Sequence, residues 1–256
     1  MNPRQVLETY DAHYASTYNQ RFLLNEASRV PSEREIGIIR ELLSPESRWL
    51  DVACGTGYVL SRFPGVSRAG LDLSPAMLRI AGAANPDALF FREGDFRDPV
   101  PEWVGRWSLV TCMWYSYGLV ESIADVRQVI RNLADWTSEQ GVCFVPLCDP
   151  AILSAGTEIP YRAPRKVAGG TVLITGVIWS WIEESGKRHE NMVAPQIEHM
   201  VAMFREHFGV VEVIDYPLAS TGWRSRFLRR SRSARRKALV ARARKPFPPR
   251  KPLSPS

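Results

Sequence analysis

The stretch that most constrains this chain is an apolar segment that ends in an acid and runs into a short loop of small residues. Residues 49–52 are apolar apart from Asp51, and Ala53-Cys54-Gly55-Thr56-Gly57 follows them. The pattern predicts a buried strand, a tight turn and the start of a helix. Because Gly55 and Gly57 can adopt positive φ and carry no Cβ, the backbone of this turn can approach a ligand closely.

A second apolar segment, residues 69–73, carries an acid that supports a nucleotide ligand. Asp72 lies at roughly the twenty-residue offset at which a carboxylate meets a ribose diol. The dinucleotide fingerprint also requires a third small residue for close packing of helix on strand, and this chain has Leu60 there. The interpretation as an NAD site is weakened accordingly.

Three motifs, in order along the chain, resemble those of class I S-adenosylmethionine-dependent methyltransferases. Residues 51–57 resemble the first motif, residues 70–78 the second and residues 93–97 the third, and the resemblance covers residues 10–149. It implies an α/β fold with a Rossmann-like, doubly wound, mostly parallel seven-stranded sheet, and S-adenosyl-L-methionine as cofactor. The cofactor-binding residues that it implies are Tyr14, Tyr18, Asp51, Ala53, Cys54, Gly55, Gly57, Asp72, Leu73, Met77, Asp95, Phe96 and Met113.

Within that set, the resemblance implies particular contacts at the adenine. The Asp95 carboxylate is expected to accept from the adenine amino group, and the Phe96 backbone N–H to donate to the ring. An Asp in a glycine turn also commonly forms an Asx-turn, so a local structural role stays open for Asp95. Leu73 is expected to lie against the flat purine face.

Four segments are expected along the chain. They are an N-terminal lid helix (1–30), the S-adenosylmethionine-binding core (31–149), a β-hairpin insertion after the fifth strand with the last helix and strand of the core (150–216), and a basic, proline-containing, flexible tail (217–256). The lid helix repeats an aromatic residue every four positions, which gives it one aromatic face. That face either covers the cofactor or packs on the core. The hairpin is similar to that of small-molecule methyltransferases of sugar and antibiotic pathways.

The net charge of +6 comes from the tail. Thirteen Lys and Arg residues and no acid lie from Arg224 onwards, so residues 1–223 carry a net charge of −7. Such a tail is either a solvated extension or a site for nucleic acid or an anionic membrane surface. No apolar run of about eighteen residues is present and no signal region follows Met1, so a cytoplasmic protein is expected.

Candidate catalytic groups lie in two regions. Tyr115 and Tyr117 follow the fourth strand and Asp149 follows the fifth, so all three are expected at the edge of the sheet where ligands bind. A sugar hydroxyl acceptor would benefit from a general base with a pKa near neutrality, which points to histidine, and His189 on the predicted hairpin and His199 are the candidates. The four cysteines show no CxxC or Cys/His spacing, so no metal site is expected.

The function predicted from the sequence is methyl transfer from S-adenosyl-L-methionine to O or N of a small polar acceptor, a sugar or glycoside. Two alternatives stay open: a nucleic-acid methyltransferase guided by the basic tail, and a non-catalytic cofactor-binding protein. A small-molecule acceptor is the expected partner. A homodimer, and a nucleic acid or anionic membrane surface bound by the tail, stay open.

Overall fold

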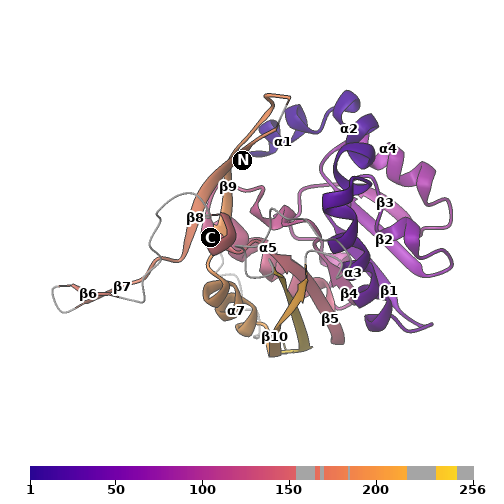
Figure 1. Cartoon of the computed structure of the whole chain (residues 1–256). Coiled ribbons are helices and arrows are strands. Elements are labelled where there is room, and N and C mark those ends of the chain that lie inside the picture. The colour runs from indigo at the N-terminus through magenta and orange to yellow at the C-terminus, as the bar shows by residue number, and fades with distance from the viewer. Residues whose placement is uncertain (154–164, 168–169, 184, 218–234, 247–256) are drawn as a thin grey trace, which may run out of the picture.

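A central sheet organises the molecule in this computed structural model, which describes residues 1–153, 165–167, 170–183, 185–217 and 235–246. Seven strands lie in the order β10-β11-β5-β4-β1-β2-β3 (Figure 1). Strands β1 to β5 are parallel to their neighbours in that group, whereas β11 is antiparallel to both β5 and β10. The predicted α/β fold with a mostly parallel seven-stranded sheet is therefore confirmed. The strands are β1 (Arg48–Val52), β2 (Ser67–Asp72), β3 (Phe90–Glu93), β4 (Trp107–Thr111), β5 (Thr137–Leu147), β10 (Phe208–Pro217) and β11 (Arg235–Arg244).

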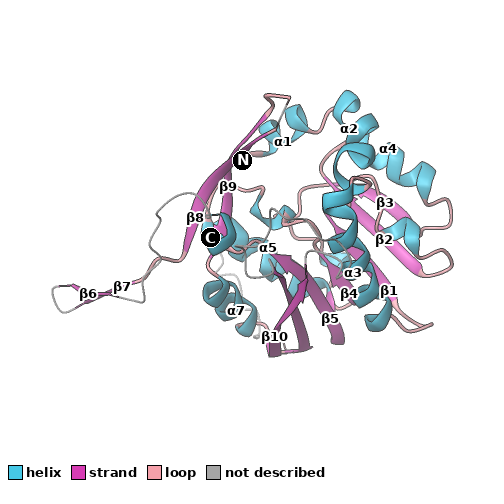
Figure 2. Cartoon of the chain, in the orientation of Figure 1, coloured by secondary structure: helices cyan, strands magenta, loops and turns pink. Residues whose placement is uncertain are grey.

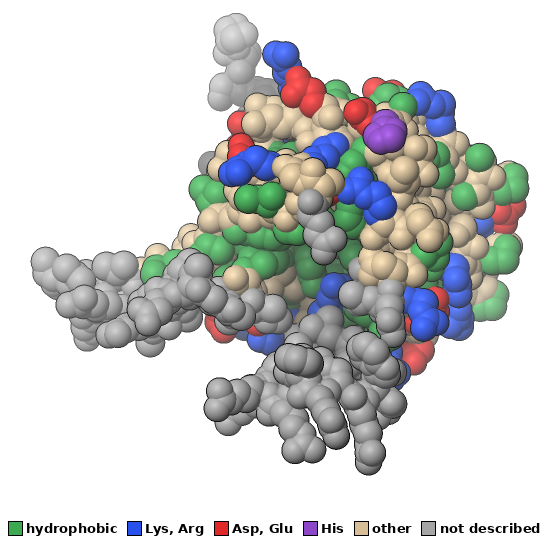
Figure 3. Space-filling model, turned by 45° about the horizontal axis from the view of Figure 1, so that its top comes forward, with side chains coloured by type: hydrophobic (Ala, Val, Ile, Leu, Met, Phe, Trp, Pro, Cys, Tyr) green, Lys and Arg blue, Asp and Glu red, His purple; other side chains and the backbone are tan. Residues whose placement is uncertain are grey.

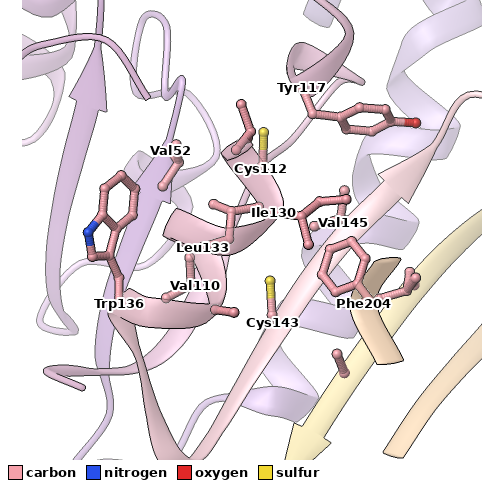
Figure 4. Packing of buried hydrophobic residues seen from close by; sticks show 14 of the residues in the cluster. Val52, Val110, Cys112, Tyr117, Ile130, Leu133, Trp136, Cys143, Val145 and Phe204 are labelled. Carbon is pink, nitrogen blue, oxygen red and sulfur yellow. The ribbon is translucent and has the colours of Figure 1, made fainter. Parts of the chain in front are cut away.

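Helices cover both faces of the sheet, as the ribbon coloured by secondary structure shows (Figure 2). Successive residues of β1 point to opposite faces: Trp49 packs with the cluster that includes α3, and Leu50 with the cluster that includes α5 and α7. Figure 4 shows the second cluster, in which Leu133 of α5 and Phe204 of α7 lie over the sheet. The helices of the sheet layers are α3 (Glu26–Leu42), α4 (Pro75–Ala84), α5 (Ile123–Trp136), α6 (Pro150–Leu153) and α7 (Ile197–Arg205).

The N-terminal segment is not the single helix expected over residues 1–30. Helix α1 (Pro3–Thr9) ends before Asp11, whose side chain accepts from the Tyr14 N–H at 2.8 Å and caps α2 (Ala12–Tyr18). A π-helical turn (Asn19–Leu23) then leads into α3. The N-cap at Asp11 breaks the pattern because its side chain replaces the backbone acceptor that a continuous helix would supply. The aromatic face nevertheless survives, since Tyr14 and Ala15 cluster with Ala76 and Met77 of α4.

The prediction of a flexible tail is wrong for residues 235–244, which form β11 between β5 and β10. Leu239 pairs with Val145 on one side and Val213 on the other, and residues 238–241 are fully buried or nearly so. Four consecutive apolar residues lie between Lys237 and Arg242. Because basic residues flank them on both sides, the composition of the segment did not indicate a strand. The predicted last strand, at residues 210–214, is therefore an edge strand. Residues 218–234 and 247–256 lie outside the described part of the chain.

The expected hairpin insertion after β5 is confirmed. Strand β8 (Gly176–Ile182) pairs antiparallel with β9 (Arg188–Pro195), and Figure 1 shows this hairpin beside α1. A second antiparallel pair, β6 (Arg165–Val167) and β7 (Gly170–Val172), precedes it. On the face shown in Figure 3, basic side chains are interspersed with acidic ones. No described helix is long and apolar enough to cross a membrane.

Candidate active site at the carboxyl edge of the sheet

The glycine loop after β1 lines a cavity of about 70 Å³, here called the glycine-loop cavity. Gly55 has φ +54° and Gly57 φ +67°, the left-handed region that glycine adopts without strain. A Cβ at Gly55 would meet no protein atom within 4 Å, whereas one at Gly57 would lie 2.7 Å from the side-chain nitrogen of Asn85. Gly55 thus leaves an open backbone face toward the cavity, and Gly57 allows the loop to pack on α4.

Asp72, at the end of β2, is fixed in the same cavity by backbone donors. Its Oδ2 accepts from the Gly55 N–H at 2.7 Å, and its Oδ1 accepts from the Ser74 N–H at 2.9 Å. Burial raises the pKa of this carboxyl despite those hydrogen bonds. An ionised carboxylate has about four acceptor positions, more than its backbone donors use, so Asp72 can also accept from a ligand diol without releasing the loop. Predicted residues that line this cavity with Asp72 are Tyr18, Ala53, Gly55, Leu73, Met77 and Phe96.

Asp95 does not line the glycine-loop cavity. Its carboxylate instead accepts from Arg97, with the Asp95 Oδ1 2.9 Å from Nε and Oδ2 2.5 Å from a terminal guanidinium nitrogen. Arg97 and Phe96 take part in the cavity wall. The predicted contact between Asp95 and an adenine amino group stays a prediction, and it requires the carboxylate to serve a second partner beside Arg97.

A small cavity of about 40 Å³ adjoins the loop at Asp51 and is called the Asp51 cavity. Asp51 is only 1% exposed, and its Oδ1 accepts from the Thr111 hydroxyl at 2.6 Å. That hydroxyl in turn accepts from the Trp49 indole N–H at 2.8 Å. Burial raises the pKa of Asp51 to about 7, and the hydrogen bond from Thr111 opposes this only in part. Other predicted cofactor residues in its wall are Tyr18, Ala53, Cys54, Gly55 and Met113.

A much larger cavity of about 960 Å³, the aromatic cavity, lies between the N-terminal helices, the hairpin and the turn after β4. Aromatic side chains from all three segments line it, namely Tyr10, Tyr14, Tyr18, Phe22, Trp114, Tyr115, Trp179 and Trp181. It shares Tyr10, Tyr18, Ser116 and Leu119 with the glycine-loop cavity. Two ligands, one in each cavity, would therefore meet at this shared wall.

His189 lies in the aromatic cavity, as its predicted catalytic role requires, but it is already engaged. Its Nε2 is 2.6 Å from Oε1 of Glu183 and 3.2 Å from the Tyr14 hydroxyl, and its ring stacks on Trp181 with centroids 4.8 Å apart. Arg21 forms an ion pair with the other carboxylate oxygen of Glu183. With Nε2 donating to Glu183, Nδ1 is the ring nitrogen that can accept a proton.

Glu183 is the anionic centre of this group. Burial on its own would raise its pKa, but hydrogen bonds from Tyr14, His189 and Ser185 and the Arg21 charge together lower the pKa to about 2. Tyr14 donates its hydroxyl to Glu183 at 2.6 Å. Tyr14, predicted to contact the cofactor, thus lines the aromatic cavity and connects α2 to the hairpin.

Two predicted catalytic residues lie outside the aromatic cavity. Tyr117 is 1% exposed within the core shown in Figure 4, and its hydroxyl accepts from the Cys148 N–H at 2.9 Å. Asp149 accepts from Lys237 Nζ at 2.7 Å. A catalytic role is therefore unsupported for both, because each side chain is held by a structural partner away from the cavity. Tyr115 does line the cavity, although burial raises the pKa of its hydroxyl and makes it a poor base.

Several residues that line these cavities were not among the predicted site residues. Ser116 lines all three cavities, Tyr10 lines two, and Glu183 and Arg236 line the aromatic cavity. Tyr10 belongs to the aromatic face predicted for the N-terminal helix, and Ser116 lies between the predicted Tyr115 and Tyr117, so the sequence held a signal for both. Arg236 was hidden in the basic segment. Among the described residues, no group of three or more His, Cys, Asp or Glu side chains could hold a metal ion.

The parallel sheet, with its ligand loop at the carboxyl edge, defines a Rossmann-like nucleotide-binding protein. A methyltransferase-domain family model matches residues 50–141. A dTDP-3-amino-3,4,6-trideoxy-alpha-D-glucopyranose N,N-dimethyltransferase of Streptomyces venezuelae is 31% identical over 196 residues, which cover 75% of this chain and 71% of the relative. A dTDP-3-amino-3,6-dideoxy-alpha-D-glucopyranose N,N-dimethyltransferase of Streptomyces fradiae is 36% identical over 147 residues, which cover 55% and 54%. The chain belongs to the class I S-adenosylmethionine-dependent methyltransferases.

A solved structure also resembles this chain, and the matches cover different shares of the relatives' lengths. An amino pentose methyltransferase of Micromonospora echinaspora, solved with S-adenosylmethionine bound, has a TM-score of 0.55 at 20% identity and covers 90% of this chain and 96% of its own. That likeness supports the fold. The chain spans about half the length of two of the curated relatives that it matches, and 71% of the third.

Proposed function

We propose that this chain transfers a methyl group from S-adenosyl-L-methionine to the amino nitrogen of a small, sugar-like acceptor. The observation that carries the proposal is the shared wall of the two cavities, where Tyr10, Tyr18 and Ser116 belong to both. A nucleoside-bearing donor on the glycine-loop side and an acceptor on the aromatic side would meet there. The two Streptomyces relatives, which are named as amino-sugar N,N-dimethyltransferases, support an amine acceptor.

The residues of the glycine loop fit the donor. The open face of Gly55 gives a nucleoside close access to the backbone, and Asp72 offers lone pairs to a ribose diol. Leu73 and Met77 supply apolar surface for the purine in the same wall. When bound, the donor supplies an electrophilic methyl group on a sulfonium, whose leaving group is good. The protein's main task is then to hold the acceptor atom in line and exclude water, for which effective molarities of about 10⁵ to 10⁸ M are known.

The state of the candidate bases favours nitrogen over oxygen. A hydroxyl acceptor needs a strong, free base to take its proton as it attacks, whereas a neutral amine attacks through its lone pair and needs a base only for the proton that it releases after gaining the methyl group. Tyr117 and Asp149 are occupied outside the cavity, and burial raises the pKa of Tyr115. His189 can take a proton on Nδ1 while Glu183 holds Nε2, which suffices for an amine.

The test is a comparison of matched acceptors. The full-length protein is incubated with methyl-labelled S-adenosylmethionine and a dTDP-linked aminodeoxy sugar, the same sugar with a hydroxyl in place of the amine, an unlinked glycoside and an RNA. Mass spectrometry should find one or two methyl groups on the amino sugar alone. Methylation of the hydroxyl sugar at an equal rate would refute nitrogen as the target, and methylation of RNA alone would refute a small acceptor.

A further inference from the structure

Glu35 is a buried carboxylate that the proposed methyl transfer does not use. It lies on α3, is 1% exposed, and is not among the residues that line the three cavities. Its Oε1 accepts from the Tyr216 hydroxyl at 2.6 Å and lies 3.5 Å from a guanidinium nitrogen of Arg236. Burial raises the pKa of Glu35, and the charge of Arg236 and the hydrogen bond from Tyr216 oppose that rise.

Arg236 connects this carboxylate to the aromatic cavity. It lies at the start of β11, lines the cavity, and faces two rings: its guanidinium carbon is 5.5 Å from the ring centroid of Trp114 and 5.5 Å from that of Tyr115. A planar guanidinium against two aromatic faces restrains the orientation of both rings. The same guanidinium group lies 3.5 Å from Oε1 of Glu35, which restrains it by charge.

The turn under Arg236 has an unfavourable conformation. Trp114 has φ 56° and Tyr115 φ 61°, and bulky residues rarely adopt this left-handed region. The indole N–H of Trp114 is also buried with no hydrogen-bond partner in the described part of the chain. Such strain persists only where the surroundings impose it, and it clusters at functional sites. The next residue, Ser116, lines all three cavities, so the turn sets the wall at which donor and acceptor would meet.

We propose that Glu35 is a positioning residue: it fixes Arg236, and Arg236 holds the Trp114–Tyr115 turn in the conformation that places Ser116 at the shared wall. For its kinetic consequence the proposal rests on the methyl transfer proposed above. Arg236 itself lines the cavity, so variants of Arg236 would not separate positioning from substrate contact. Glu35 does separate them, because it does not line the cavity and acts through another side chain.

The test compares Glu35→Gln with Glu212→Gln as a matched control. Glu212 pairs with Arg242 at 3.1 Å and also joins β10 to β11, but this pair is exposed and away from the turn. In Glu35→Gln we expect kcat to fall about tenfold to a hundredfold, because small misplacements near the reacting atoms are costly. The affinity for S-adenosylhomocysteine, measured by calorimetry, should stay within about threefold, and urea unfolding should remain a single cooperative transition. Glu212→Gln should leave all three unchanged.

A second variant extends the kinetic test, and hydrogen exchange adds a measurement that does not depend on turnover. Tyr216→Phe removes the hydroxyl donor but keeps the charge pair, so its kcat should lie between those of the parent and Glu35→Gln. Backbone amides of residues 114–118 should exchange hydrogen faster in Glu35→Gln than in the parent or Glu212→Gln. If the parent methylates no acceptor, the proposed function fails and the exchange rates alone decide. Parental kcat and exchange in Glu35→Gln, or equal losses of kcat, cofactor affinity and urea midpoint, would overturn the positioning role.

Discussion

The burial of Asp51 predicts how the free energy of unfolding depends on pH. The sign of that dependence is the quantity that tests the prediction. Its folded pKa is about 7 against an ordinary value of 3.8, so the contribution of this group to stability is complete below about pH 4 and is lost as the pH rises to 7. A difference of about three pKa units corresponds to about 4 kcal/mol at 1.36 kcal/mol per unit. Asp51→Asn imitates the protonated form, because its amide oxygen can still accept from Thr111.

The expected result is therefore a difference that grows with pH. The free energy of unfolding of Asp51→Asn minus that of the parent should rise by up to about 4 kcal/mol between pH 4 and pH 8. An unsatisfied amide N–H would subtract about 1 kcal/mol at every pH, so the slope is more informative than either endpoint. Urea unfolding followed by far-ultraviolet circular dichroism at one-unit pH steps measures it, provided that the m-values of the two proteins agree.

Asp87 supplies a control of opposite sign. Hydrogen bonds from the buried Arg68 guanidinium lower the pKa of Asp87, so its contribution to stability is present near neutrality and is lost as the pH falls through the lowered value. Asp87→Asn should be destabilised most at neutral pH and least in acid. The free energy of unfolding of Asp51→Asn minus that of the parent could instead be independent of pH or fall as the pH rises. In that case burial does not raise the pKa of Asp51, and the prediction is wrong.

Three further changes separate binding, packing and catalysis. Asp72→Asn should weaken cofactor binding by about 10-fold to 100-fold in calorimetry, since hydrogen bonds to a charged acceptor contribute about 1.5 to 3 kcal/mol; an unchanged affinity would contradict the diol assignment. Gly57→Ala should destabilise the protein by about 1 to 3 kcal/mol in urea unfolding, because its Cβ would lie 2.7 Å from the Asn85 side chain and its φ is positive; parental stability would show that the loop relaxes. Tyr117→Phe should lower stability by about 1 kcal/mol through the lost acceptor for Cys148 and leave kcat unchanged, and a tenfold fall in kcat would restore Tyr117 as a catalytic candidate.

The sequence predicted the strand and the glycine loop at residues 49–57 because local rules decide their conformation. A short apolar strand, small residues and an acid at a fixed offset specify a turn and a carboxylate with little help from the rest of the chain. Gly55, Asp72 and Met77 all line the glycine-loop cavity as expected. The parallel arrangement of β1 to β5 follows from the alternation of strands and helices along the chain.

Contacts between residues far apart in the sequence decided the features that could not be predicted. The segment at residues 235–244 is basic in composition, yet a run of four apolar residues is enough when a gap between β5 and β10 is there to fill. Asp95 and Asp149 looked available as carboxylates, but Arg97 and Lys237 reach them. No sequence pattern predicts an ion pair between residues that are 88 positions apart, such as Asp149 and Lys237.

Different segments of the chain line the two cavities, so substitutions can alter one cavity and leave the other unchanged. Apart from residues 114–119, the walls of the aromatic cavity come from outside the family match at residues 50–141: the N-terminal helices, the hairpin, Cys148 and the start of β11. The glycine loop and Asp72 lie inside that match. Substitutions at the hairpin or at β11 can therefore reshape the aromatic cavity while the glycine loop and Asp72 keep their hydrogen bonds. Ser116 lines both cavities, so a change in the conformation of the turn at residues 114–116 should alter binding in both cavities together.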